Sequence, residues 1–248
     1  MTRPLTLITG GTRGIGGATA LRLAEAGHDL VLGYARDDSA AENVTARVRD
    51  AGAECLAVRA DLVADDGVET LFTAAADRGV LTGVVNNAGA TLNIGPLAET
   101  PPDVIRRTVD LNLTAALFVA RAAVRAMSTA HNGRGGVLVN VSSGAATLGS
   151  PGEYVQYAAA KAGVDAMTIG LGQEVAADGI RVVGVAPGIV RTDIHADAGE
   201  SDRVDRVGPK VPLGRAGEPT EVADAIAWLL SDAASYVTGT TLRVAGGR

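Results

Sequence analysis

The stretch TLITGGTRGIGGATA, residues 6–20, passes from a short apolar segment through five glycines into an alanine-rich segment. Gly10, Gly14 and Gly16 have the spacing G-x-x-x-G-x-G where a predicted strand turns into a predicted helix. Glycines at such a turn let the backbone bend sharply and approach a pyrophosphate closely. The helix that follows presents free N–H groups and the positive end of its dipole. The stretch therefore predicts a dinucleotide site directly after the first strand.

The glycines alone leave the frame of this motif open. Gly11, Gly14 and Gly17 also fit a G-x-x-G-x-x-G pattern, and a glycine-rich turn without any ligand is the plain alternative. A predicted strand before the glycines and a predicted helix after them favour the dinucleotide site.

Short apolar segments alternate with longer amphipathic segments along the whole chain, as in proteins with buried parallel strands. This alternation predicts an α/β fold with a doubly wound parallel sheet of about seven strands, and favours it over a closed eight-stranded barrel. The predicted strands are residues 5–9, 30–34, 55–59, 81–85, 137–141, 180–186 and 240–244. The predicted helices are approximately residues 14–26, 39–50, 66–78, 102–130, 154–177 and 219–231.

The chain has 248 residues, of which 47% are hydrophobic, and no Pro-rich, Gly/Ser-rich or charged segment divides it. We therefore expect a single domain over residues 1–248. Residues 191–215 interrupt the strand–helix alternation with a polar, irregular sequence. Segments of this kind are often lids over a binding site.

Composition argues against several classes of partner. The net charge is −6 without a basic stripe and only 3% of residues are aromatic, so we expect no nucleic-acid partner. No apolar run reaches the roughly 18 residues that cross a membrane. The first residues, MTRPLTLITGG, pass directly into a strand pattern, so we expect no secretory segment. The single Cys55 is consistent with a cytoplasmic location. His28, His131 and His195 are too scattered for a metal site, so we expect none. We expect His28 and His131 in surface turns, and for His195, in the segment 191–215, we favour the surface over contact with a substrate.

A second informative stretch is EYVQYAAAKAG, residues 153–163, which contains one of only two lysines in the chain. Tyr157 and Lys161 are four residues apart and share one face of a helix, whereas Tyr154 lies about two turns from Lys161. A nearby ammonium group lowers the pKa of a phenol, which would let Tyr157 act as a general acid/base. The plain alternative is an amphipathic helix with an outward-reaching lysine.

Further motifs follow in order: NNAG at 86–89, Asn112, NVSS at 140–143, PGIVRTD at 187–193 and VTGTTLRVAGG at 237–247. Together with the glycine loop and Tyr157-x-x-x-Lys161, they make the chain resemble the short-chain dehydrogenase/reductase family over its whole length. The resemblance is to shorter members similar to 3-oxoacyl carrier protein reductases and sugar dehydrogenases. It implies a Rossmann fold and hydride transfer with a nicotinamide dinucleotide.

The resemblance also implies a catalytic set of Asn112, Ser143, Tyr157 and Lys161. The substrate-binding serine would be Ser143, but Ser142 stays open because Ser143 lies 14 residues before Tyr157, one more than the usual family spacing. Asn112 would complete a proton relay with the lysine. Its plain alternative is an asparagine that bonds the backbone of a neighbouring helical turn.

Cofactor contacts are implied by the same resemblance. Asn87, Ala88 and Gly89 would face the adenosine half, Asp61 would face the adenine, and Ile189 and Thr192 would bind the nicotinamide amide. The complete expected set is Gly10, Thr12, Arg13, Gly14, Ile15, Gly16, Tyr34, Arg36, Asp61, Leu62, Asn87, Ala88, Gly89, Tyr157, Lys161, Pro187, Gly188, Ile189 and Thr192.

The choice between NADP and NAD depends on the end of the second strand. NAD-selective family members have an acid at the position that Tyr34 occupies here. Arg13 and Arg36 offer guanidinium groups that suit a 2′-phosphate, so we expect NADP. Asp37 and Asp38 are the counter-argument, because either could pair with Arg36 or replace the acid.

These observations predict an NADP-dependent carbonyl reductase or alcohol dehydrogenase that acts on a small-molecule carbonyl or alcohol. The resemblance implies a homotetramer, which the long alanine-rich segments support. One alternative is an NAD-dependent sugar or alcohol dehydrogenase. Another is a non-catalytic dinucleotide-binding regulator, although such a protein would be expected to lack part of the catalytic set.

Overall fold

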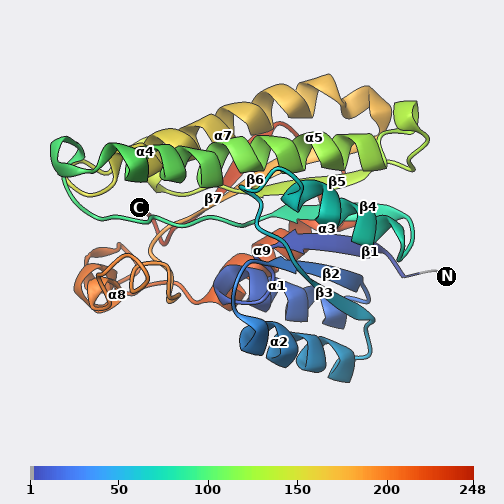
Figure 1. Ribbon diagram of the computed structural model, residues 1–248, viewed down its shortest axis with the longest axis horizontal. Coiled ribbons are helices and arrows are strands. Elements are labelled where there is room, and N and C mark those ends of the chain that lie inside the picture. Colours follow the sequence, from blue (N-terminus) through green and yellow to red (C-terminus); the bar gives the residue numbers. More distant parts are fainter. Residues whose placement is uncertain (1–2) are drawn as a thin grey trace.

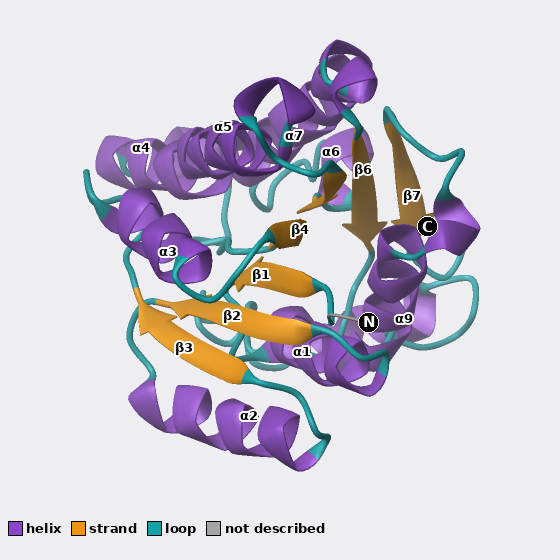
Figure 2. Ribbon diagram, turned by 90° about the vertical axis from the view of Figure 1, so that its right-hand side faces the viewer, coloured by secondary structure: helices purple, strands orange, loops and turns teal. Residues whose placement is uncertain are grey.

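The computed structural model describes residues 3–248, which form a seven-stranded parallel sheet between two layers of helices (Figures 1 and 2). The strand order is β3-β2-β1-β4-β5-β6-β7, so the predicted doubly wound sheet is confirmed. Four strands are one residue longer than predicted, because each continues into the adjoining turn. The strands are β1 (Leu5–Thr9), β2 (Asp29–Tyr34), β3 (Cys55–Arg59), β4 (Leu81–Asn86), β5 (Gly136–Val141), β6 (Ile180–Pro187) and β7 (Thr240–Val244).

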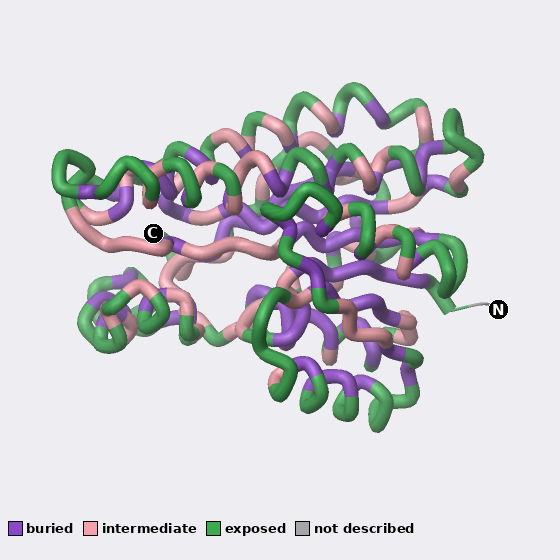
Figure 3. The backbone as a smooth tube through the Cα atoms, in the orientation of Figure 1, coloured by how far each residue is buried: buried purple, intermediate pink, exposed green. Residues whose placement is uncertain are grey.

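Helices cover both faces of the sheet (Figure 2). One layer contains α1 (Gly14–Glu25), α2 (Asp38–Asp50) and α9 (Pro219–Leu230). The other contains α3 (Gly67–Ala76), α4 (Pro102–Val109), α5 (Ala115–Met127) and α7 (Val155–Glu174). Neighbouring residues of a strand point to opposite faces, so Ile8 and Leu7 enter different apolar clusters. Buried residues accordingly follow the strands and the inner helix faces (Figure 3).

The chain changes direction in the sheet between β1 and β4. From β1 it continues outward to β2 and β3, and then returns to place β4 on the other side of β1. The connections leaving β1 and β4 therefore diverge, which opens a crevice at the carboxyl ends of these strands. Thr9 joins the two ends, since its hydroxyl oxygen accepts from the Asn87 N–H at 2.9 Å.

The helix predicted over residues 102–130 is divided in the structure. A π-helical segment, Asp110–Thr114, separates α4 from α5, and a 3₁₀ turn, Thr129–His131, follows α5. Asn112 lies fully buried in the π segment, where its Nδ2 donates to the Thr108 carbonyl at 2.9 Å and to the Ala90 carbonyl at 2.8 Å. The amide thus bonds both the preceding helical turn and the loop after β4, and the helix widens at this position.

The segment 191–215 is more ordered than its composition predicted. It contains α8 (Arg203–Val207) and a 3₁₀ turn, Gly208–Lys210, and the part around α8 lies beyond the carboxyl ends of the strands in Figure 1. A further short helix, α6 (Ala145–Leu148), precedes α7. The remaining 3₁₀ turns are Leu97–Glu99, Ala176–Asp178 and Asp232–Ala234.

Candidate active site

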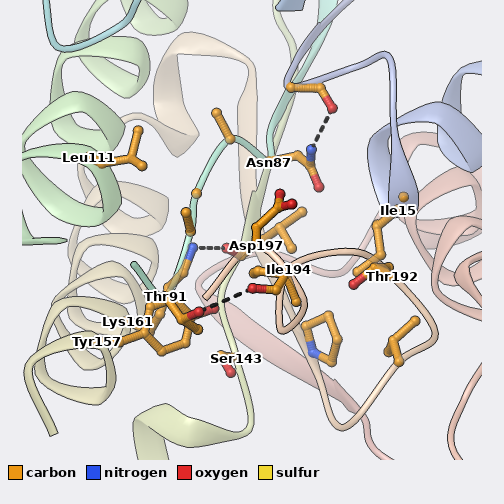
Figure 4. A pocket seen from close by; sticks show the side chains of 18 of the residues that line it. Ile15, Asn87, Thr91, Leu111, Ser143, Tyr157, Lys161, Thr192, Ile194 and Asp197 are labelled. Carbon is orange, nitrogen blue, oxygen red and sulfur yellow. Dashed lines mark hydrogen bonds between the residues drawn. The ribbon is translucent and has the colours of Figure 1, made fainter. Parts of the chain in front are cut away.

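A cavity of about 830 Å³ extends from the glycine loop after β1 to the segment 191–215 (Figure 4). It lies at the carboxyl ends of the strands, where the crevice of a doubly wound sheet opens. Of the residues expected from the sequence, Gly16 and Asn112 do not line this cavity, whereas all the others do.

The glycine loop follows the frame of Gly10, Gly14 and Gly16. Gly14 has a φ of +50°, which disfavours a side chain, and a Cβ on Gly16 would lie 2.1 Å from the Gly10 carbonyl oxygen. In the alternative frame, a Cβ would lie 3.0 Å from the Ile8 carbonyl oxygen at Gly11 and 3.3 Å from the Thr12 carbonyl carbon at Gly17, so the constraint is weaker than at Gly16. No acidic residue occupies the first turn of α1. The loop and the start of α1 therefore fit the pyrophosphate of a dinucleotide.

The ribose end of the cavity is shaped by β2 and the start of α2. The Tyr34 hydroxyl donates to Asp38 Oδ1 at 2.8 Å, and Asp37 caps α2 by accepting from the Ala40 N–H at 2.9 Å. Asp38 also lies 3.7 Å from Arg59. Within residues 3–248, Arg36 forms no ion pair, so neither aspartate neutralises it.

Arg13 of the glycine loop reaches the segment 191–215. Its Nη2 lies 3.2 Å from Asp197 Oδ2, and about half of each side chain is exposed. In Figure 4 Asp197 lies over the cavity, close to Ile194. This ion pair joins the proposed phosphate-binding loop to the opposite rim of the cavity, a contact that the sequence did not predict.

Tyr157 and Lys161 lie together near the start of α7 (Figure 4). They are 7% and 4% exposed, and Lys161 Nζ is 5.7 Å from the centroid of the Tyr157 ring. Lys161 Nζ donates to the Val141 carbonyl at 2.9 Å. Burial lowers the pKa of Lys161 to about 8, while Asp165 acts in the opposite direction. The i,i+4 pairing is therefore present, but inside the protein.

The pKa of Tyr157 differs from the prediction. Burial raises it above its ordinary value of 10, and a hydrogen bond from Ser143 only partly counteracts this. The expected net lowering of the Tyr157 pKa was wrong, because loss of solvent disfavours the phenolate more strongly than nearby groups favour it. Tyr157 is therefore protonated at neutral pH.

The two candidate serines face different ways. Ser142 Oγ donates to the Lys161 carbonyl at 3.3 Å and is buried, so its hydroxyl joins β5 to α7. Ser143 Oγ accepts from the Ala145 N–H at 3.1 Å and also interacts with the Tyr157 phenol. Both serines line the cavity, but of the two it is Ser143 that interacts with the Tyr157 phenol.

Asn112 lies behind the cavity wall. A Cβ on Gly89 would be 2.6 Å from Asn112 Oδ1 and 3.2 Å from Lys161 Nζ, so both groups meet the backbone at Gly89. The amide of Asn112 bonds the backbone of the preceding turn, as the plain alternative expected, and it also holds the loop after β4 in place.

Three site residues were missed or misplaced by the sequence analysis. His195 was expected at the surface but is buried, and its pKa is lowered to about 4 by burial and by Arg203. Arg203 and Tyr154 also line the cavity and bond each other at 3.1 Å. The hydrogen bond between Arg203 and Tyr154 joins positions 49 residues apart, so no local sequence signal could have revealed this contact.

Metal-ligand clusters and membrane-spanning helices are both absent from residues 3–248. No three His, Cys, Asp or Glu side chains in this range are grouped as metal ligands. Nor does this part of the chain contain a helix with the length and apolarity needed to cross a bilayer.

A Rossmann-type sheet, a glycine phosphate loop at its switch point and a buried Tyr–Lys pair together define a class of dinucleotide-dependent oxidoreductases. Comparison with known proteins identifies the family. The family model described as enoyl-(acyl carrier protein) reductase matches residues 10–248. The chain belongs to the short-chain dehydrogenase/reductase family, whose members bind a nicotinamide dinucleotide.

Several relatives are similar over nearly their whole length. An uncharacterized oxidoreductase, YgfF, of Escherichia coli (strain K12) is 44% identical over 98% of this chain and 99% of its own. Cis-4-hydroxycyclohexanecarboxylate dehydrogenase of Sinomonas cyclohexanicum is 41% identical over 97% of this chain and 94% of its own. The crystal structure of a short-chain type dehydrogenase/reductase from Mycobacterium marinum matches with a TM-score of 0.91 at 31% identity, covering 98% of this chain and 94% of that one.

Proposed function

We propose that this oxidoreductase is an NADP(H)-dependent carbonyl reductase or alcohol dehydrogenase for a small-molecule substrate. The observation that carries the proposal is the position of Tyr157, Lys161 and Ser143 on the same cavity as the glycine loop. Hydride transfer to a carbonyl carbon requires a proton for its oxygen, and a positioned phenol supplies one.

A nicotinamide dinucleotide held along the glycine loop would supply the hydride that the substrate carbon takes up. The hydroxyls of Ser143 and Tyr157 hold the substrate oxygen by hydrogen bonds, and Tyr157 then donates its proton to that oxygen as negative charge develops there. Lys161 lies 5.7 Å from the ring centroid, and its ammonium group stabilises the phenolate left behind. Asn112 bonds the Ala90 backbone and so fixes the loop after β4, whose Gly89 lies beside Lys161.

Tyr157 holds its proton at neutral pH, because burial raises the pKa of its phenol further above 7. The resting side chain can therefore give a proton to a carbonyl oxygen during reduction. Alcohol oxidation would return a proton to the phenolate, so the same side chain serves both directions.

The preference for NADP rests on the unpaired Arg36 and on Arg13. Tyr34 occupies the position of the family's acid, and the Asp37 and Asp38 carboxylates after it already accept from the Ala40 N–H and the Tyr34 hydroxyl. Titration of the protein with NADPH and NADH, followed by fluorescence, tests this proposal. We expect tighter binding of NADPH, and Arg36→Asp should reverse or remove the preference. Equal affinities in the unmodified protein would refute it.

Related proteins are named as acting on different substrates: 3-oxoacyl-[acyl-carrier-protein] reductase, glucose 1-dehydrogenase 2 and cis-4-hydroxycyclohexanecarboxylate dehydrogenase. A panel of 3-oxoacyl thioesters, cyclic ketones and aldoses, assayed for NADPH oxidation, tests the proposed activity. We expect turnover with at least one carbonyl class. Cofactor binding without turnover across the panel would instead favour the regulatory alternative.

We further propose a homotetramer, because large apolar side chains are exposed on two separate surfaces. Leu117 and Phe118 of α5 and Ile169 of α7 are exposed in one helix layer, whereas Trp228 of α9 is exposed in the other layer and Leu242 on the edge strand β7. Two self-complementary surfaces on one chain produce a dimer of dimers. A cytoplasmic location remains a prediction from the single cysteine.

A further inference from the structure

Arg203, the first residue of α8, is only 2% exposed although it belongs to the polar segment 191–215. Its side chain lines the cavity, yet no step of the proposed reaction uses it. A buried guanidinium group is unfavourable unless hydrogen bonds and opposite charges surround it. The partners of Arg203 therefore indicate what the burial achieves.

Three partners from two distant parts of the chain hold the guanidinium. Nη2 donates to Glu153 Oε2 at 2.6 Å and to the Tyr154 hydroxyl at 3.1 Å, and Nη1 donates to Glu200 Oε2 at 3.1 Å. Glu153 and Tyr154 directly precede α7, whereas Glu200 belongs to the segment 191–215. Arg203 thus fastens this segment to the start of the helix that carries Tyr157.

The Tyr154 ring connects Arg203 to Tyr157, because it contacts both side chains. The guanidinium carbon of Arg203 lies 5.1 Å from the centroid of that ring. The ring in turn meets Tyr157 edge to face, with centroids 5.5 Å apart and an interplanar angle of 89°. The Tyr154 carbonyl also accepts from the Tyr157 N–H at 3.0 Å. A shift of Tyr154 would therefore turn the phenol that faces the substrate.

The charge of Arg203 is already balanced within the protein. Burial alone would lower its pKa, but hydrogen bonds to Glu153 and Glu200 outweigh this effect and raise it. The guanidinium remains charged and is bound to two carboxylates. Nε has no hydrogen-bond partner among residues 3–248, but both terminal nitrogens are engaged, so the geometry suits a fixed internal contact better than bidentate recognition of an anionic substrate.

We propose that Arg203 is a positioning residue that joins the segment 191–215 to the start of α7 and, through the Tyr154 ring, fixes the orientation of the Tyr157 phenol. This inference rests on the proposed function, since it assigns Tyr157 the proton transfer. Tyr154 is also assigned a role by this proposal. Its ring packs between Arg203 and Tyr157, and its hydroxyl is one of several groups that bond Arg203.

The first test compares Arg203→Met with Arg206→Met. Arg206 belongs to the same short helix and bonds Glu200 at 2.7 Å, but it is exposed and forms no contact with Tyr154. Rates are expressed per NADPH-binding site, so that any unfolded protein is not counted. We expect Arg203→Met to lower kcat per site about tenfold or more, as for a misplaced catalytic group, with the NADPH affinity within about twofold. Arg206→Met should behave like the unmodified protein.

A purely structural role predicts fewer NADPH-binding sites but an unchanged kcat per site, and that outcome would overturn the proposal. If Arg203→Met does not fold, Glu153→Gln weakens the same contact from its more exposed side and should lower kcat in the same direction. An unchanged kcat per site in folded Glu153→Gln would then count against the proposal.

A second comparison separates the Tyr154 ring from its hydroxyl. Tyr154→Phe keeps the ring against Tyr157 and should leave kcat within a few-fold, whereas Tyr154→Ala should approach the loss seen in Arg203→Met. Because Arg203 acts through Tyr154, the double variant should be no slower than the slower single variant. Fully additive losses would show two independent effects and contradict the inference.

Hydrogen–deuterium exchange provides a readout that does not depend on turnover. The amides of residues 154–158 should exchange faster in Arg203→Met but not in Arg206→Met, because the start of α7 loses its anchor. If the unmodified protein reduced no carbonyl, the proposed function would fail while the exchange result still tested the contact. Unchanged exchange in Arg203→Met would overturn the positioning role even in an active enzyme.

Discussion

Tyr154 and Tyr157 are three residues apart near the start of α7, but only Tyr157 lies beside Lys161 and Ser143. We predict that Tyr157→Phe lowers turnover at least about a hundredfold, as expected when a general acid is removed. The NADPH affinity should hardly change, because the phenol meets the substrate oxygen. Steady-state kinetics and cofactor titration measure both quantities. Full activity in folded Tyr157→Phe beside an inactive Tyr154→Phe would contradict the assignment.

Lys161 is predicted to make stability depend on pH. Its pKa is about 8 in the folded protein and 10.5 ordinarily. Below pH 8 the lysine is protonated in both states, so the full penalty for the buried ammonium is present. Between pH 8 and 10.5 the lysine is neutral in the folded protein and protonated in the unfolded chain, so unfolding takes up a proton. The free energy of unfolding therefore rises with pH in this range. Above pH 10.5 the lysine is neutral in both states, so its burial no longer carries the cost of a buried charge.

Lys161→Met tests this pH dependence. The variant should be more stable than the parent at pH 7, by at most about 3 kcal/mol, and the advantage should shrink by pH 9.5. Urea unfolding at the two pH values measures the difference. Equal shifts at both pH values would show that the ammonium group is not the cause.

At the residue scale, the sequence predicted the groups whose roles depend on local spacing. The i,i+4 pairing of Tyr157 with Lys161 needs only a helix, and it is present. The rise in the Tyr157 pKa was missed because burial depends on packing from distant segments. The burial of His195 and Arg203 was missed for the same reason.

Within elements, the helix from α4 to α5 illustrates what a hydrophobic pattern does not reveal. Apolar residues continue at helical spacing through Asp110–Thr114, so one long helix was predicted. The π-helical turn arises where Asn112 bonds the loop after β4 as well as its own helix. By contrast, the strands were predicted within one residue, because buried parallel strands are continuous apolar runs bounded by turns.

The glycine loop leads to a prediction about the start of α1. Gly16→Ala should abolish dinucleotide binding, because its Cβ would lie 2.1 Å from the Gly10 carbonyl oxygen and force the loop to move. Gly17→Ala is the matched control one residue later, where the nearest atom would be 3.3 Å away. It should bind the cofactor with at most a modest loss. Isothermal titration of both variants checks the frame, and a reversed order of affinities would refute it.

For the whole molecule, we predict a tetramer of the 25.0 kDa chain in solution. Phe118→Glu on α5 and Trp228→Glu on α9 should each reduce the assembly to a dimer, since each places a charge on one of two separate apolar surfaces. Val80→Glu, at an exposed residue away from both, is the control. Light scattering measures the masses, and a monomer of the unmodified protein at micromolar concentration would refute the prediction.

The ion pair of Arg13 with Asp197 has a consequence for the order of events during turnover. On the proposed assignment, the 2′-phosphate of NADP and the Asp197 carboxylate compete for one guanidinium group. A phosphate carries more negative charge than a carboxylate, so its arrival frees Asp197 and its departure lets the contact re-form. NAD has no such phosphate and would leave the pair intact. NADP would then free the segment 191–215 from the glycine loop, whereas NAD would leave the two joined. The two cofactors would therefore differ in their rates of binding and release as well as in their affinities.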